Sequence, residues 1–275
     1  MTGDEAVERA VDALLARPSI VVTDFDGTLS EIVVDPAQAS LVPGAREALT
    51  SLRDAVDAVC VVSGRSLADV RRRVGVEGLV YAGNHGLEWH GLPGEADGAE
   101  GVTARLELAP LVPALQNALS GLEGVWIEDK GLTLTIHFRG AEDVAATARA
   151  VRERAAAAVG EGYRLRPGRL ALEIVPEALL GKERFLQRVI AAIGARGVVA
   201  LGDDVSDLEA LRLVRRRAEA GIPGLAVGVA SEEAPPELAE VADTLLQGPL
   251  EAADWLLRVV SRLRDEAARR AAPSA

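Results

Sequence analysis

The chain has 275 residues, of which 49% are hydrophobic and 26% are charged. This composition is typical of a folded globular protein, and the length favours one core with one sizeable insertion. Acidic residues outnumber basic ones by 42 to 30, for a formal charge of −12. Because no basic face of the nucleic-acid-binding type is evident, we expect no nucleic-acid partner.

The cysteine content and the first residues predict a cytoplasmic protein. Cys60 is the single cysteine, which excludes an intramolecular disulfide framework. Residues 1–18 carry four acidic side chains among apolar residues at helical spacing, unlike a basic-then-apolar secretory signal. No apolar run approaches the roughly 20 residues that span a bilayer, so we expect no membrane partner.

Short apolar runs rich in β-branched residues predict buried parallel strands at 19–23, 58–62, 197–201 and 225–229. Amphipathic stretches, including 43–53 and 182–193, predict helices between them. Alternation of this kind predicts an α/β fold with a doubly wound parallel sheet.

The middle of the chain has a different pattern. It predicts helices at 104–119 and 141–159, and strands at 125–130, 132–139, 163–166 and 169–175. The turns Lys130-Gly131 and Pro167-Gly168 separate neighbouring strands closely enough for hairpins. We therefore expect a catalytic core made of residues 1–101 and 177–275, and an inserted α+β cap domain of residues 102–176.

The first chemical signal is the segment DFDGT at 24–28. In an extended backbone alternate side chains share a face, so the carboxylates of Asp24 and Asp26 project together after a strand. One carboxylate can attack phosphorus, and the other can protonate the leaving oxygen and then deprotonate water. A calcium loop of the EF-hand type is disfavoured, because Thr28 and Leu29 stand where that loop needs a ligand and a glycine.

A second acidic segment, GDDVSD at 202–207, follows a predicted strand and opens a helix. Asp203 and Asp207 are spaced i, i+4, and Asp204 and Asp207 are spaced i, i+3, so these side chains can converge. Helix capping by Asp203 or Asp204 explains one acid of the three. Hard oxygen ligands with room for water and a phosphate favour Mg²⁺ as the cofactor.

Phosphate-holding groups are also present. Ser63 and Gly64 end the second predicted strand, where a hydroxyl and a flexible backbone can bind phosphoryl oxygens. The 30 basic residues comprise 28 arginines and two lysines, Lys130 and Lys182, which suggests that a compact ammonium is needed at those positions. A cysteine nucleophile of the tyrosine-phosphatase type is excluded, because the loop from Cys60 to Arg65 is one residue too short.

In order, the motifs DFDGT, Ser63, Lys182 and GDDVSD resemble those of the haloacid dehalogenase superfamily, which implies a Rossmann-like core. The resemblance implies that Asp24 is the nucleophile and Asp26 the general acid and base. It implies that Ser63 and Lys182 hold the phosphoryl group. It assigns the metal to Asp24, Asp26 and Asp203, with support from Asp204 and Asp207.

The segments DFDGTLSEIVVDP, SGR, YAGNHGLE, IEDKGLTLTIHFR and LEIVP are similar to those of the trehalose-phosphatase family. This resemblance implies a cytoplasmic, Mg²⁺-dependent hydrolase that converts trehalose 6-phosphate to trehalose and phosphate through an aspartyl phosphate. It implies a set of substrate-binding residues: Gly27, Thr28, Gly64, Arg65, Asn84, His85, Glu128, Lys130, His137, Arg139 and Glu173.

Alternatives remain open at this point. A phosphatase for another sugar phosphate, such as sucrose phosphate or mannosylphosphoglycerate, would share every core motif. A phosphomutase or a catalytically silent sugar-phosphate sensor would share part of them. We expect a monomer whose partner is a small sugar phosphate, with a synthase as a further candidate, and a cap that closes on hinges near Gly101 and Gly181.

Overall fold

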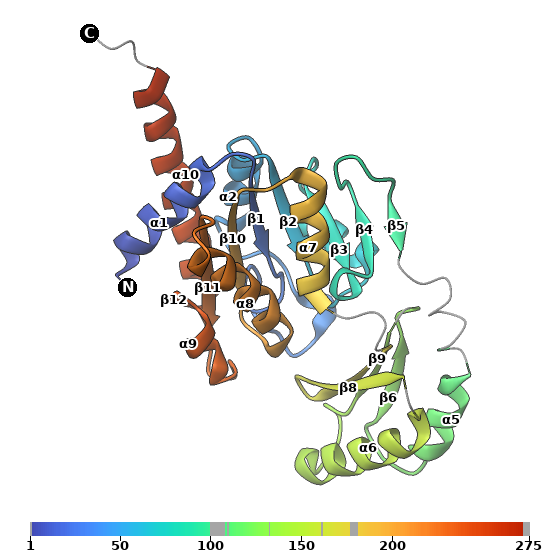
Figure 1. The fold of residues 1–275 in the computed structure, drawn as a ribbon. Helices are drawn as coiled ribbons and strands as arrows, with labels where there is room; N and C mark the ends of the chain where they lie inside the picture. The colour runs from blue at the N-terminus through green and yellow to red at the C-terminus, as the bar shows by residue number, and fades with distance from the viewer. Residues whose placement is uncertain are drawn as a thin grey trace. The chain divides into compact units, whose positions relative to one another are not determined.

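The computed structural model describes residues 2–99, 108, 110–131, 133–160, 162–176 and 181–271. The chain divides into two compact units (Figure 1). Unit 1 comprises Met1–Gly98 and Gly181–Ala275, and unit 2 comprises Ala99–Leu180, which is inserted between them. The expected boundaries at 102 and 176 stay a prediction. The expected hinge at Gly101 lies outside the described residues, and Gly181 begins a helix.

Unit 1 is built on an eight-stranded sheet in the order β12-β11-β10-β1-β2-β3-β4-β5. Its strands are β1 (Ser19–Thr23), β2 (Ala58–Val62), β3 (Val80–Gly83), β4 (Glu88–His90), β5 (Gly98–Ala99), β10 (Gly197–Gly202), β11 (Gly224–Ala230) and β12 (Thr244–Gln247). The run from β12 to β3 is parallel, and β4 pairs antiparallel to β3. The four strands predicted in unit 1 are present, and the predicted fold class is confirmed.

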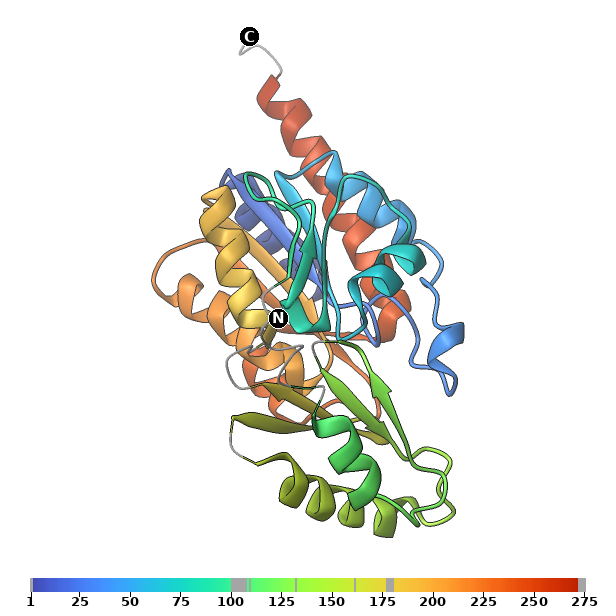
Figure 2. The ribbon, with the colours of Figure 1, turned by 90° about the vertical axis from the view of Figure 1, so that its right-hand side faces the viewer.

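Both faces of this sheet are buried, which explains the continuous apolar runs. Val21 and Val59 pack with the helices of one layer, and Ile20 and Cys60 pack with those of the other. The first layer contains α1 (Gly3–Leu15), α2 (Ala45–Arg53), α3 (Leu67–Val74) and α10 (Gly248–Ala271). The second contains α7 (Gly181–Ile193), α8 (Val205–Glu219) and α9 (Glu237–Val241). Figure 2 shows the two layers on opposite sides of the sheet.

Unit 2 is a four-stranded antiparallel sheet packed on helices. The sheet has the order β6-β7-β9-β8, with β6 (Trp126–Asp129), β7 (Leu134–His137), β8 (Tyr163–Gly168) and β9 (Ala171–Pro176). One face packs Leu134, Ile136 and Ile174 against α5 (Leu111–Ala118) and α6 (Val144–Val159). The predicted α+β character of this segment is therefore confirmed.

Some predicted details of unit 2 differ from the structure. The second hairpin turns at Arg169-Leu170 instead of Pro167-Gly168, because Gly168 still pairs with Ala171. Pro167 is tolerated within β8 because this strand lies at the edge of the sheet. The predicted helix at 104–119 is described as α5 from Leu111, whereas residues 104–107 and 109 lie outside the described residues.

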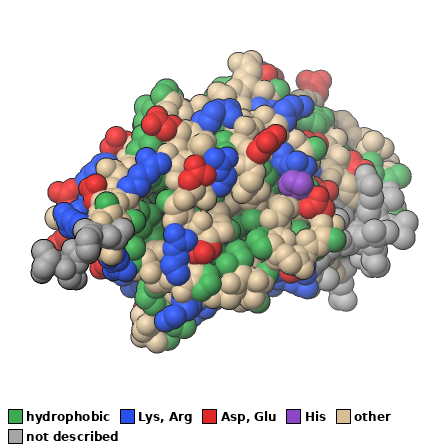
Figure 3. Space-filling model, turned by 90° about the horizontal axis from the view of Figure 1, so that it is seen from above, with side chains coloured by type: hydrophobic (Ala, Val, Ile, Leu, Met, Phe, Trp, Pro, Cys, Tyr) green, Lys and Arg blue, Asp and Glu red, His purple; other side chains and the backbone are tan. Residues whose placement is uncertain are grey.

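The surface carries charges of both signs. Figure 3 shows acidic and basic side chains interspersed over the face that it presents. Within the described ranges, no helix combines the length and the apolar character needed to cross a bilayer.

Candidate active site

The loop after β1 places carboxylates at the carboxyl edge of the parallel sheet. Asp24 is 6% exposed, whereas the Asp26 side chain is 36% exposed. Gly27 has φ of +80°, and a Cβ at this position would lie 1.9 Å from Oδ2 of Asp203. A side chain at this position would collide with that carboxylate, so glycine is what allows Asp203 to approach the loop. The Thr28 hydroxyl donates a hydrogen bond to Oδ1 of Asp203 at 3.0 Å.

Three buried carboxylates converge on Lys182. Oxygens of Asp24, Asp203 and Asp207 lie within 4.8 Å of one another. Asp24 follows β1 and Asp203 follows β10, and these strands are parallel neighbours whose ends meet at one edge. From the first turn of α7, Nζ of Lys182 lies 3.0 Å from Oδ2 of Asp24 and 2.7 Å from Oδ1 of Asp207. The structure thus brings together residues that are up to 183 positions apart (24 to 207).

The electrostatics of this cluster favour an added cation. Burial raises the pKa of Asp24 to about 7, although Lys182 opposes the rise. Burial and the neighbouring carboxylates of Asp24 and Asp207 also raise the pKa of Asp203. Burial alone would lower the pKa of Lys182, but Asp207 and Asp24 outweigh it and raise that pKa. Because one ammonium faces three carboxylates, the site fits a hard metal ion bound by oxygen.

The acids of the 203–207 segment have different surroundings. Asp204 is the N-cap of α8, where its side chain accepts a hydrogen bond from the Val205 amide at 2.6 Å. Asp207 is 3% exposed and accepts hydrogen bonds at 3.2 Å from the backbone amides of Asp203 and Asp204. Capping accounts for Asp204, whereas Asp207 orients Lys182 and the turn after β10.

The loop after β2 is packed against a strained turn. Ser63 is fully buried, and its carbonyl accepts a hydrogen bond from the His85 amide at 2.9 Å. Asn84 and His85, in the 3-10 turn η2 (Asn84–Gly86), have φ of 48° and 58°. A Cβ on Gly64 would lie 2.8 Å from Cε1 of His85. Two successive left-handed residues other than glycine store strain, which is typical of functional sites.

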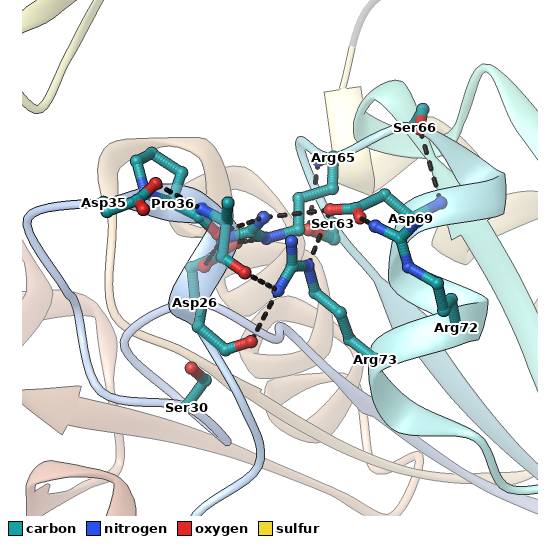
Figure 4. Close-up of polar contacts among 12 residues, drawn as sticks. Asp26, Ser30, Asp35, Pro36, Ser63, Arg65, Ser66, Asp69, Arg72 and Arg73 are labelled. Carbon is teal, nitrogen blue, oxygen red and sulfur yellow. Dashed lines mark hydrogen bonds and ion pairs between the residues drawn. The ribbon is translucent and has the colours of Figure 1, made fainter.

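Arg65 is bound to Asp26 through two hydrogen bonds (Figure 4). Its Nε and Nη2 donate to the two carboxylate oxygens at 2.7 and 2.6 Å. Its Nη1 donates to Oδ2 of Asp69 at 2.9 Å and to the Pro36 carbonyl at 3.0 Å. The family resemblance implied that Arg65 contacts the substrate. In the structure its guanidinium pairs with Asp26, the residue that the resemblance assigns as general acid and base.

Glu128, His137 and Glu173, which were predicted to bind the sugar, lie on the polar face of the sheet of unit 2. Glu128 pairs with Thr135, and Thr135 pairs with Glu173, so their side chains share one face. Nε2 of His137 lies 2.8 Å from Oε2 of Glu128. Nζ of Lys130 lies 3.6 Å from Oε1 of Glu173. Arg139, just after β7, is partly buried.

Sequence reasoning missed one residue in each unit that contacts a predicted site residue: Trp126 in unit 2 and Asp69 in unit 1. Trp126 is 56% exposed, and its ring stacks on that of His137 with centroids 4.1 Å apart. It stands two positions before Glu128, so the strand period could have placed it on the same face.

Asp69 is four residues after Arg65, and this helical spacing was a usable signal for their ion pair.

Comparison with known proteins agrees with this fold. A family model described as "Trehalose-phosphatase" matches residues 22–239. The trehalose-phosphate phosphatase of Mycolicibacterium paratuberculosis is 38% identical over 227 residues, which cover 80% of this chain and 57% of that protein. The corresponding protein of Mycobacterium leprae is 35% identical, over 81% of this chain and 56% of its own length. The chain therefore spans a little over half the length of these relatives.

Two solved structures show the same fold. The C-terminal domain of the Candida albicans trehalose-6-phosphate phosphatase superposes with a TM-score of 0.77 at 18% identity, covering 95% of this chain and 97% of that one. A haloacid dehalogenase-like hydrolase from Bacteroides thetaiotaomicron has a TM-score of 0.64 at 15% identity, covering 88% of this chain and 100% of that one. The fold is that of the haloacid dehalogenase-like α/β proteins. Within this class, the chain belongs to the trehalose-phosphatase family.

Proposed function

We propose that this chain is a Mg²⁺-dependent phosphatase that hydrolyses trehalose 6-phosphate to trehalose and inorganic phosphate. The observation that carries the proposal is the buried Asp24 carboxylate, held 3.0 Å from the Lys182 ammonium beside Asp203 and Asp207. Family membership supports the substrate, because the matched relatives carry the name trehalose-phosphate phosphatase. The carboxylate-only donor set supports a hard ion such as Mg²⁺ over zinc.

The first chemical step uses two carboxylates from the loop after β1. An oxygen of Asp24 attacks phosphorus, and the bond from phosphorus to the sugar oxygen breaks. Asp26 gives its proton to that oxygen, so the disaccharide leaves as an alcohol. Lys182 and the Ser63 loop hold the phosphoryl oxygens during the transfer. The product is an aspartyl phosphate on Asp24.

The second step regenerates the enzyme. Asp26, now ionised, accepts a proton from a water molecule as its oxygen attacks phosphorus. The bond from phosphorus to Asp24 breaks, and inorganic phosphate leaves. Asp24, Asp203 and the Asp26 carbonyl would hold Mg²⁺, with Asp204 and Asp207 in support. The ion supplies positive charge that offsets the charge on the phosphoryl group.

Unit 2 would act as the cap that selects the sugar, with residues 102–176 as its extent. Its polar face offers carboxylate, ammonium and imidazole groups, which suit a ligand rich in hydroxyls. Partners would be limited to small sugar phosphates in the cytoplasm, and a monomer would suffice because each proposed catalytic group comes from this chain. A synthase is a further candidate partner.

The proposal is tested by measuring phosphate release from a panel of sugar phosphates with Mg²⁺ and with EDTA. We expect trehalose 6-phosphate to have the highest kcat/KM, and EDTA to reduce turnover to background. Faster turnover of sucrose phosphate or mannosylphosphoglycerate would instead support a different sugar phosphatase. Binding without phosphate release would support the silent sensor, and transfer to a second hydroxyl would support a phosphomutase.

Trp126 is expected to contribute to sugar binding. Its exposed ring, stacked on His137 beside Glu128, offers a flat apolar surface next to polar groups. Such a combination suits the apolar face and the hydroxyls of a pyranose ring. We expect Trp126→Ala to raise KM for trehalose 6-phosphate about tenfold, which corresponds to about 1.4 kcal/mol, and to leave kcat within about twofold.

Two matched variants control for this substitution. Trp126→Phe keeps an aromatic face and is expected to retain most of the affinity. Leu250→Ala removes a side chain of similar exposure, 55%, from unit 1 and should leave KM unchanged. Equal KM values for the wild type and Trp126→Ala would remove Trp126 from the binding surface.

A further inference from the structure

The Asp26 carboxylate is held in one orientation by a single guanidinium. Arg65 donates to both of its oxygens, at 2.6 and 2.7 Å, through two parallel hydrogen bonds. This arrangement fixes the plane of the carboxylate as well as its distance. A carboxylate offers about four lone pairs, so two remain for exchanging a proton with the substrate.

Arg65 is itself held from the opposite side. Its Nη1 donates to Oδ2 of Asp69 at 2.9 Å and to the carbonyl of Pro36 at 3.0 Å. Its guanidinium carbon lies 5.4 Å from the centre of the Phe25 ring. The side chain is only 13% exposed, and four of its five N–H groups are engaged in these hydrogen bonds, which leaves Arg65 little capacity to bind a substrate as well.

Asp69 fixes this arrangement to the protein scaffold (Figure 4). It lies in the first turn of α3, and its Oδ2 also accepts a hydrogen bond from Nε of Arg73 at 2.7 Å. Nη1 of Arg73 in turn donates to the Ala39 carbonyl at 2.6 Å. Burial alone would raise the pKa of Asp69, but hydrogen bonds from Arg73 and Arg65 outweigh it and lower that pKa. Asp69 therefore stays ionised at neutral pH.

We propose that Asp69 is a positioning residue for the acid and base step, acting through Arg65 on the carboxylate of Asp26. This inference rests on the proposed function, since it concerns the same reaction. Asp26 is partly exposed in the loop after β1, and its carboxylate accepts two hydrogen bonds from Arg65. The chain of ion pairs from α3 to Asp26 restricts the rotation of this carboxylate. Small misplacements of a proton donor are costly in rate.

The test compares two substrates whose leaving groups differ in their need for a proton. The sugar oxygen of trehalose 6-phosphate must be protonated as it leaves, whereas p-nitrophenolate is stable without a proton. The ratio kcat/KM reports the steps up to the first irreversible one, which here is transfer of the phosphoryl group to Asp24. We expect Asp69→Asn to lower kcat/KM about tenfold for trehalose 6-phosphate and less than twofold for p-nitrophenyl phosphate.

Matched variants separate positioning from a structural effect. Asp69→Glu keeps the carboxylate and should restore part of the loss. Arg72→Gln removes the guanidinium that pairs with the other oxygen of Asp69, on the solvent side, and should leave both substrates unaffected. If Asp69→Asn lowers the unfolding temperature too far for assay, Arg65→Lys tests the same link, because lysine keeps the charge and loses the two parallel donors.

The outcomes are distinguishable. Selective loss with the sugar phosphate supports the inference. Equal loss with both substrates, or no loss with either, overturns the positioning role and leaves the proposed phosphatase intact. A wild-type protein that releases phosphate from neither substrate would overturn the proposed function itself, and the positioning role with it.

Discussion

Replacing Asp24 with asparagine is expected to reduce turnover of trehalose 6-phosphate by at least about a thousandfold, because an amide oxygen does not form the covalent phosphoryl intermediate. The fold should persist. Burial raises the pKa of Asp24 to about 7, so the site tolerates an uncharged group there, and the substitution removes repulsion from Asp203 and Asp207. We therefore expect the unfolding temperature of Asp24→Asn to equal or exceed that of the wild type.

The measurement pairs phosphate release with thermal unfolding and mass spectrometry of acid-quenched enzyme. The wild type should carry one phosphoryl group on the peptide that contains Asp24, and the variant should carry none. Asp57→Asn makes the same chemical change at the opposite, amino-terminal end of the parallel strands, where Asp57 binds Arg17 and the Ser19 amide. It should keep full activity. An active Asp24→Asn protein would remove Asp24 from the role of nucleophile.

Replacing Lys182 with methionine is expected to affect both stability and activity. Lys182 is 4% exposed and contacts two carboxylates, and methionine has a similar shape without the charge. Removing one partner of a buried ion pair leaves uncompensated charge, which costs about 3–5 kcal/mol of unfolding free energy. Loss of the ammonium should also lower kcat about a hundredfold or more, since it stabilises the transferring phosphoryl group.

The other lysine of the chain provides the control. The Lys130 side chain lies 3.6 Å from Glu173 and is 17% exposed, against 4% for Lys182, so Lys130→Met should cost less unfolding free energy than Lys182→Met. Its effect on turnover of the sugar phosphate should appear in KM. Chemical denaturation of both variants, with and without Mg²⁺, measures the difference. Equal stability of the two variants would contradict the view that Lys182 neutralises the acidic cluster.

The sequence predicted the elements that follow from local patterns. Continuous apolar runs predicted β1, β2, β10 and β11, because a parallel strand covered on both faces needs an apolar side chain at nearly every position. The short strands β3, β4, β5 and β12 were missed. β12 alternates buried and exposed residues over only four positions, which is too short a pattern to separate from a loop.

The sequence also predicted several residues of the candidate site. The motifs around Asp24 and Asp203 predicted a paired acidic site at the ends of strands, and the scarcity of lysine drew attention to Lys182. The pairing of Arg65 with Asp26 was not predicted, because a sequence separation of 39 residues carries no periodic signal. The same limit applied to the stacking of Trp126 on His137 across two strands.

By itself the sequence determined the fold class, the family and the residue types available for chemistry, since backbone periodicity and motif spacing are local properties of the chain. Only the tertiary structure decided which acids share the buried cluster. Asp207 faces Lys182 while Asp204 caps α8, although both are spaced to reach the site. The reason is physical: a side chain's partner depends on how β10, α7 and α8 pack together, and that packing follows from the burial of the whole core.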